Sequence, residues 1–332
     1  MKKILFSILA LCGSIVATAQ STDETSAILQ HGDQISIYKG NTGLQQAYAN
    51  AAEGDVINLS SGSFKPVTIE KAITIYGVGF EDNAETNTPR TQIDGDWTIG
   101  KDGNVLDGFY MEGVSTNSYV YFRGQIKNAL IRRCYLGYTV TFYGYSENVV
   151  FNQCRFYNGI FGRDNLTNRL LVSNCYVGGR VYAFVPQSFV NIDHSIATTL
   201  YSNGFGNAQF LWTNSILYAG NNDKVPVGAF STVKNCIVVN GAGQFQENML
   251  VENCHYVDLA SIFADSENID YDASRTFVLK DPTTYVGTDN TPIGLSGGDG
   301  WNKIPYKPYV SELSATPSGT NLNVTYEAGV DK

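Results

Sequence analysis

Seven short segments of the chain share one arrangement of apolar and polar positions and follow one another about every twenty residues. In each segment an apolar residue lies three positions before a Cys or Ser, and most segments carry a second apolar residue two positions after it. The residue directly before the Cys or Ser is always polar and is most often Asn. A repeat of fixed period at this length is the signature of a solenoid. The central positions of the segments are Cys134, Cys154, Cys175, Ser195, Ser215, Cys236 and Cys254.

Apolar residues spaced two apart on either side of a polar break indicate strand, bend and strand. A repeat of about twenty residues is too short for a pair of helices but long enough for three short strands and three turns. The pattern therefore predicts an all-β fold, a parallel β-helix with coils of about twenty residues and an inward Cys/Ser column. We expect the Asn column in the bends, in the left-handed conformation that Asn tolerates, with side chains that bond the coils above and below. A β-sandwich is the less favoured alternative, because sandwich strands do not repeat such a phase.

The first residues of the chain, MKKILFSILALCGSIVATAQ, are unlike the repeat. Two lysines, a short apolar stretch and an A-x-A cleavage signal are typical of a secretory signal peptide, which we assign to residues 1–19. The apolar stretch is too short for a membrane span, and no later stretch is long enough for one. The sequence therefore predicts a secreted or cell-surface protein.

The remaining chain divides into a solenoid and a tail. We expect the β-helix over residues 20–303, with irregular final coils after Cys254, and a tail with one strand over residues 304–332. Thr42 precedes GLQQAYANAA, whose apolar residues lie on one helical face. This pattern predicts a short N-terminal helix that caps the open end of the solenoid.

The segment that follows this helix reads GDVINLSSGSFKPVTIEKAITIYGVG. Together with the helix it resembles the opening coils of the pectin-lyase-like right-handed parallel β-helix superfamily, in particular its secreted bacterial β-helix-repeat members. The resemblance covers roughly residues 35–300, and it implies a right-handed solenoid. It does not imply an activity, because the superfamily includes lyases, hydrolases, esterases and adhesins.

The net charge bears on which partners the protein can bind, and the positions of the cysteines bear on whether they form disulfides. Without residues 1–19 the chain has 20 basic and 31 acidic residues. Such a surface repels nucleic acid and anionic membranes. The five cysteines outside the signal peptide all lie on the inward column, which favours a ladder of buried free thiols. Disulfides between neighbouring coils, Cys134–Cys154 or Cys154–Cys175, stay open, because a coil spacing of about 4.8 Å lies within disulfide reach.

Lyases of the superfamily, as the resemblance implies, use a basic residue to abstract a proton and carboxylates to hold calcium. Arg163 and Asp164 form the best local pair of this kind and are the candidate catalytic residues, but no stacked pair of aspartates adjoins them. Asp193 and His194 lie in the bend column, which favours a structural turn. We predict no metal site, with calcium as the one cofactor considered. The enzymatic alternative is a polysaccharide lyase or glycoside hydrolase that acts on an acidic polysaccharide.

Aromatic residues give the clearer indication of function. Tyrosines recur directly after the Cys/Ser column and again one strand later, so we expect exposed rings on consecutive coils. Such rings stack on sugars, and arginines between them bond hydroxyls; the competing interpretation is that outward tyrosines only favour strands. The sequence thus predicts a non-catalytic protein that binds a polysaccharide or cell-surface glycan or acts as an adhesin. The predicted carbohydrate-binding residues are Tyr135, Tyr143, Arg163, Tyr176, Arg180, Tyr182 and Tyr201.

Overall fold

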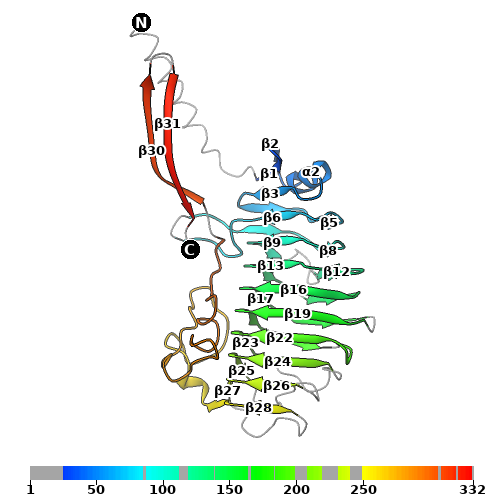
Figure 1. Ribbon diagram of the computed structural model, residues 1–332, viewed down its shortest axis with the longest axis vertical. Helices are drawn as coiled ribbons and strands as arrows, with labels where there is room; N and C mark the ends of the chain where they lie inside the picture. The colour runs from blue at the N-terminus through cyan, green and yellow to red at the C-terminus, as the bar shows by residue number, and fades with distance from the viewer. Residues whose placement is uncertain are drawn as a thin grey trace.

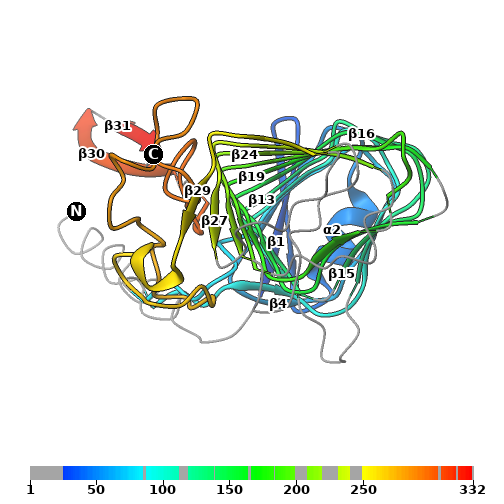
Figure 2. The same ribbon diagram turned by 90° about the horizontal axis from the view of Figure 1, so that it is seen from below.

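The computed structural model describes residues 25–330 except 85–86, 112–118, 138, 164–165, 183, 199–207, 219–230, 240–248, 306–307 and 319–320. The described chain forms a parallel β-solenoid whose coils stack along the long axis of the molecule, as Figure 1 shows. Three sheets make its sides, and Figure 2 shows them end-on. The predicted signal peptide lies outside the described residues. No described helix is long and apolar enough to cross a membrane.

The first of these three sheets contains the longest strands of the solenoid. Its first two strands pair antiparallel, and the strands from β3 onward pair parallel, one coil to the next. In spatial order they are β2 (Gln34–Lys39), β1 (Ser26–His31), β3 (Val56–Leu59), β6 (Thr74–Tyr76), β9 (Val105–Asp107), β13 (Leu130–Arg132), β16 (Ser146–Asn152), β19 (Asn168–Ser173), β22 (Phe189–Asp193), β24 (Gln209–Thr213), β26 (Thr232–Lys234) and β28 (Leu250–Glu252), while β12 (Ile126–Lys127) also pairs with β16.

The other two sheets are wholly parallel. The second sheet consists of β4 (Gly62–Phe64), β7 (Thr91–Ile93), β10 (Tyr110–Met111), β14 (Tyr135–Leu136), β17 (Arg155–Phe156), β20 (Tyr176–Val177), β23 (Ile196–Ala197), β25 (Ile216–Tyr218), β27 (Ile237–Val239) and β29 (His255–Val257). The third sheet consists of β5 (Thr68–Ile69), β8 (Trp97–Ile99), β11 (Tyr119–Phe122), β15 (Thr139–Phe142), β18 (Gly159–Gly162) and β21 (Arg180–Tyr182).

The repeat identified in the sequence is the register of the first sheet. Its leading apolar residues pair directly from Ile131 through Phe151, Val172, Ile192, Trp212 and Val233 to Val251. All of them except Val251 are buried at 1% exposure or less. The predicted parallel solenoid with coils of about twenty residues is therefore confirmed.

The Cys/Ser column points inward and carries a hydrogen-bond ladder. Ser195 Oγ accepts the backbone N–H of Cys175, and Ser215 Oγ accepts that of Ser195, each at 3.0 Å. Cys175 Sγ accepts the N–H of Cys154 in the same way at 3.3 Å. A short side chain with an acceptor atom thus satisfies a buried N–H of the preceding coil, which explains why Cys and Ser interchange here. All five described cysteines are free thiols.

The residue before each Cys or Ser adopts the predicted left-handed conformation, with φ between 44° and 57° in all seven coils. The expected side-chain bonds are only partly present. Asn214 Nδ2 donates to Asp193 Oδ1 of the preceding coil at 2.9 Å. Asn174 Nδ2 instead donates to the carbonyl oxygen of Gly297 at 2.7 Å, on a segment that lies outside the solenoid.

That segment, residues 258–305, is called the strap below, and it corrects the expectation of irregular final coils. It begins with the 3₁₀ turn η1 (Leu259–Ser261) and runs back along the bend column towards the first coils (Figure 1). The end-on view shows it outside the second sheet (Figure 2). Its backbone or side chains contact Asn214 near residue 288, Asn174 near 297 and Gln153 near 300. Apolar residues of the strap pack against outward residues of the second sheet, and this packing holds the strap on the solenoid. That cluster contains Tyr176, Ile196, Ile216, Ile237, Val239, Ile262, Phe263, Ile269, Phe277, Leu279, Ile293 and Leu295.

The two ends of the described chain carry the other elements. Helix α2 (Gly43–Asn50) buries Leu44 and Ala47 next to β1, β2 and β3 at one end of the stack. Its role as a cap stays a prediction. The tail forms two strands rather than the one expected, because β30 (Pro308–Ser318) pairs antiparallel with β31 (Asn321–Val330).

Candidate functional site

An open groove of about 580 Å³ lies on the outer face of the third sheet. The strands β11, β15, β18 and β21 build it, because their outward residues pair in register from one coil to the next. This register places Tyr121, Thr141, Phe161 and Tyr182 in one column across the groove. The groove is lined by Tyr121, Thr139, Thr141, Tyr143, Asn158, Phe161, Arg163, Gly178, Gly179, Arg180 and Tyr182.

Aromatic rings and guanidinium groups alternate along the groove. The rings of Tyr121 and Tyr143 lie 5.6 Å apart, and those of Phe161 and Tyr182 lie 4.3 Å apart. The Arg163 guanidinium bridges the two pairs, at 5.5 Å from the Tyr143 ring and 5.0 Å from the Phe161 ring. These distances are within the range of cation–π attraction, so the ring pairs and the arginine hold each other in place.

Glycines on adjacent coils allow close packing of the backbone beside the groove. A Cβ at Gly179 would lie 2.0 Å from the carbonyl carbon of Asn158. A Cβ at Gly159 would lie 1.9 Å from the backbone oxygen of Arg180, and Gly159 has a φ of 100°. The two coils therefore approach so closely at these positions that a residue with a side chain would clash with the backbone of the neighbouring coil.

The structure brings four of the predicted binding residues together in this groove: Tyr143, Arg163, Arg180 and Tyr182. The expected exposure of Tyr135 and Tyr176 is wrong. Their rings point away from the solenoid interior, but the chain that packs over the second sheet leaves them only 3% and 5% exposed. Tyr176, for example, donates its hydroxyl to the Ile269 carbonyl oxygen of the strap at 3.0 Å. Tyr201 lies outside the described residues.

Lining residues that the predicted set omits include Thr139, Thr141 and Asn158. The signal for Thr141 was the register of the strands, because Thr141 pairs with the aromatic residues Tyr121 and Phe161 of the two neighbouring coils. The candidate base Arg163 is exposed in the groove, while its proposed partner Asp164 lies outside the described residues. The described lining contains no carboxylate. Nor do the described residues contain a group of three His, Cys, Asp or Glu side chains placed to hold a metal ion. The described lining of the groove offers stacking surfaces and N–H donors.

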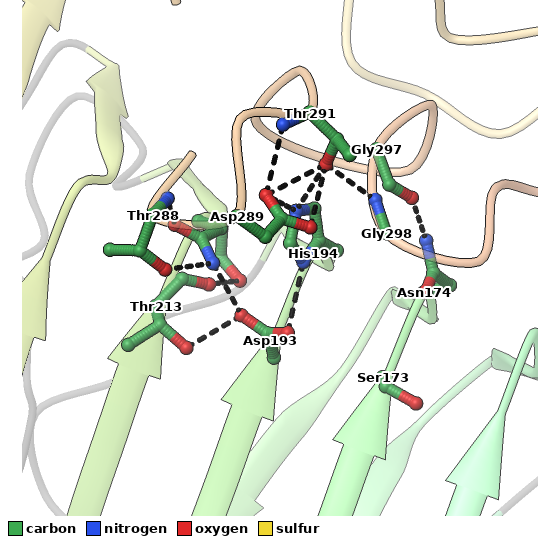
Figure 3. A network of polar contacts seen from close by, with 12 residues as sticks. Ser173, Asn174, Asp193, His194, Thr213, Thr288, Asp289, Thr291, Gly297 and Gly298 are labelled. Atoms are coloured by element: carbon green, nitrogen blue, oxygen red, sulfur yellow. Dashed lines mark hydrogen bonds and ion pairs between the residues drawn. The ribbon is translucent and has the colours of Figure 1, made fainter. Parts of the chain in front are cut away.

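A polar network between the strap and the bend column surrounds His194, the second position that the sequence singled out (Figure 3). The imidazole is 2% exposed. Its Nδ1 lies 2.9 Å from Asp193 Oδ2, and its Nε2 lies 3.0 Å from Thr291 Oγ1 and 3.4 Å from Asp289 Oδ1. The expected structural turn is present, and it also binds the strap.

The partners of this imidazole favour its protonated form. Thr291 Oγ1 already accepts the N–H of Gly298 at 2.7 Å and lies 2.9 Å from both carboxylate oxygens of Asp289, to which it donates. Protonated His194 carries an N–H on each ring nitrogen, so Nδ1 can donate to Asp193 and Nε2 to Thr291 at the same time. Burial lowers the pKa of His194, but the hydrogen bond and charge of Asp193, together with the charge of Asp289, outweigh burial and raise it. For Asp193 the directions are opposite. Burial raises the pKa of its carboxyl group, but the hydrogen bonds from His194 and Thr213 outweigh burial and lower the pKa below its ordinary value.

We expect the strap to loosen as the pH rises. A raised folded-state pKa contributes stability that is complete below the ordinary value of 6.5 and is lost as the pH rises through the folded-state pKa of His194. The measurement is the hydrogen-exchange protection factor of the strap amides of Gly294 and Gly298 between pH 6 and 9. His194→Gln should remove the pH dependence, whereas His31→Gln, at the other end of the solenoid, should retain it. Equal pH profiles for wild type and His194→Gln would contradict the assignment.

Comparison with known proteins adds no relative: no protein-family model matches the chain, and no curated protein matches it. Function is therefore argued from the groove and its surroundings. The property of the groove that bears on function is the alternation of aromatic rings with guanidinium groups.

Proposed function

We propose that the protein is an exported β-solenoid that binds a polysaccharide or cell-surface glycan without catalysis, as a carbohydrate-binding or adhesin-like protein. The observation that carries this proposal is the groove on the third sheet, in which Tyr143, Phe161 and Tyr182 alternate with Arg163. Aromatic rings present flat apolar faces to the C–H faces of sugars. The arginines, Thr139 and Asn158 supply donors and acceptors for hydroxyl groups.

The direction of the groove supports a chain-like ligand. Neighbouring coils are spaced by about 4.8 Å, and the outward column from β11 to β21 carries rings at Tyr121, Phe161 and Tyr182, with Tyr143 beside it on the coil of Thr141. A glycan that runs along the solenoid therefore meets a ring or a guanidinium group on successive coils. Arg163 and Arg180 also make the groove basic in a chain whose net charge is −9. An acidic glycan is accordingly expected to bind more tightly than a neutral one of the same length.

The same proposal includes the finer features of the fold. The opening motif GDVINLSSGSFKPVTIEKAITIYGVG and the parallel coils support membership of the pectin-lyase-like superfamily. Right-handed coiling is the rule for parallel strand connections. Helix α2 lies at the first coil, where it would cover the open end of the core, and residues 1–19 would direct export.

Removal of one groove ring should weaken glycan binding with little change in stability. We expect Tyr143→Ala and Tyr182→Ala each to cost roughly 0.5–1.5 kcal/mol of binding, about a two- to twelvefold loss of affinity. Tyr157→Ala is the matched control, because Tyr157 is 54% exposed and lies outside the groove lining. A glycan array identifies the ligand, and isothermal titration then compares the variants, with melting temperature as the check on folding.

Two outcomes would remove the proposal. A large drop in the melting temperature of Tyr143→Ala, with no glycan bound by either form, would mean that the rings serve only the solenoid. Release of unsaturated or hydrolysed products from a bound glycan, with or without calcium, would favour the lyase or hydrolase alternative. The array is therefore run with and without calcium while product release is monitored.

A further inference from the structure

A second pocket, of about 280 Å³, lies on a different side of the solenoid, where the strap passes the early coils. Three parts of the chain build it: the loop after β6, the outward residues of the second sheet, and the strap. Its volume is just below the range of pockets that hold drug-sized ligands, so it fits a ligand of about one ring. The lining residues are Phe80, Glu81, Arg90, Tyr110, Tyr135, Arg155, Tyr271, Asp272 and Ala273.

The wall of this pocket is a continuous stack of rings and guanidinium groups. The Arg90 guanidinium lies 3.6 Å from the Tyr110 ring, and the Tyr110 and Tyr135 rings lie 4.5 Å apart with only 11° between their planes. The Arg155 guanidinium lies 4.6 Å from the Tyr135 ring and 3.8 Å from the ring of Tyr271. Two tyrosine rings thus pack against the Arg155 guanidinium group, and its N–H groups are the part that can bind a ligand.

The carboxylates of the pocket are already engaged by the protein. Glu81 pairs with Lys303 at 2.8 Å and accepts the hydroxyl of Tyr271. Asp272 accepts the backbone N–H and the hydroxyl of Ser274 at 2.8 Å and 2.5 Å. Burial, followed by the charge of Glu81, raises the pKa of Tyr271, so this hydroxyl stays protonated and keeps its bond to Glu81.

The arginines are not neutralised in the same way. Arg90 donates to Gln92 Oε1 at 3.3 Å, and no described carboxylate forms an ion pair with it. Arg155 has neither an ion pair nor a hydrogen-bond acceptor among the described residues, and its Nε is buried. A buried cationic donor without an acceptor costs free energy, and a bidentate oxyanion would remove that cost.

We propose that this pocket is a binding site for a small carboxylate-bearing ring compound. The carboxylate pairs with the guanidinium edge of Arg155, and the ring contacts the apolar wall formed by Phe80, Ala273 and the edges of Tyr110 and Tyr135. The site is independent of the groove on the third sheet. It requires the strap, because Tyr271 holds Arg155 in place from the strap side.

The test is isothermal titration of the full-length protein with benzoate, with benzyl alcohol as the neutral probe of similar shape. Wild type should bind benzoate saturably, inorganic sulfate should compete with it, and benzyl alcohol should bind at least about tenfold more weakly. Arg155→Gln should lose about tenfold or more in benzoate affinity. Arg163→Gln, in the groove, should leave benzoate binding unchanged, which separates this site from the proposed glycan site.

Arg90→Gln supplies a second variant in case Arg155→Gln does not fold. Arg90 lies at the other end of the stack, in the loop after β6, so its replacement disturbs the core less, and it should weaken benzoate binding about threefold or more. Absence of saturable benzoate binding by wild type would overturn the proposal. So would equal affinities for benzoate and benzyl alcohol, or wild-type benzoate affinity in both folded arginine variants, or in Arg90→Gln alone if Arg155→Gln is unfolded.

Discussion

Asp107→Asn should lower the free energy of unfolding by about 3–5 kcal/mol, the usual cost of leaving a buried charge without its partner. Asp107 is fully buried at the end of β9 and accepts bonds from Arg132 Nε at 2.7 Å and Arg133 Nε at 2.8 Å. A second bond comes from Arg133 Nη2. Arg133 is itself 2% exposed, so the guanidinium has little access to water that could replace the carboxylate.

Backbone conformation adds to the cost at this site. Arg133 belongs to the bend column and has a φ of 46°, a conformation that long side chains rarely adopt. The paired carboxylate holds the arginine there, whereas the preceding coil uses Gly108, with a φ of 84°, at the same phase. In Asp107→Asn the strained backbone conformation of Arg133 remains, but the ion pair that stabilises it is lost.

Chemical denaturation at pH 7 measures the effect of Asp107→Asn. The control is Asp33→Asn, because Asp33 is exposed in the turn between β1 and β2, and its replacement should change stability by less than about 0.5 kcal/mol. A loss below about 1 kcal/mol in Asp107→Asn would show that the pair behaves like a surface ion pair. In that case burial of Arg133 would have to be offset by other contacts.

Much of the fold could be predicted because each coil solves the same packing problem. The inward column needs an apolar residue at Ile131 and at every equivalent position, and the bend needs a residue that tolerates positive φ. Both requirements recur about every twenty residues, so the same residue types recur at the same positions when the repeats are aligned. Tyr182 in the groove could be predicted for the same reason, since it pairs with Phe161 in the register of the third sheet. Tyr143 also lines the groove, but it lies two residues after Thr141, the residue that pairs with Phe161.

The strap could not be predicted in this way, because its contacts join residues more than seventy positions apart without a repeat, as Asn214 and Thr288 do. One signal was nevertheless present. The residues directly after the Cys/Ser column include Ile196, Ile216 and Ile237, and outward isoleucines on three successive coils indicate a covered face. The burial of Tyr135 and Tyr176 follows from the same cover. The place of Gly179 in the groove lining was also missed, since its close approach to the backbone of Asn158 on a neighbouring coil leaves no pattern in the sequence.

Phe151→Ala should also destabilise the protein by about 3–5 kcal/mol. Phe151 is fully buried in the inward column, and its ring lies 5.2 Å from Phe156, 5.9 Å from Phe122 and 6.4 Å from Phe142. The backbone ladders of β13 and β19 fix the coils on either side. Those coils cannot move closer to each other to fill the space that the Phe151 ring leaves, so most of the resulting cavity should remain.

The consequences should be local, since each coil of a solenoid contacts mainly its neighbours. In Phe151→Ala, amide exchange should accelerate in β13, β16 and β19 more than in β28. Glycan binding should weaken as well, because Phe142 lies behind the groove on the same strand as Thr141 and loses a packing partner. Tyr157→Ala, which removes a ring that is 54% exposed, should change neither exchange nor stability by more than about 0.5 kcal/mol. Uniform acceleration along the whole stack would instead mean that the coils unfold as one unit, and stability could then not be assigned coil by coil.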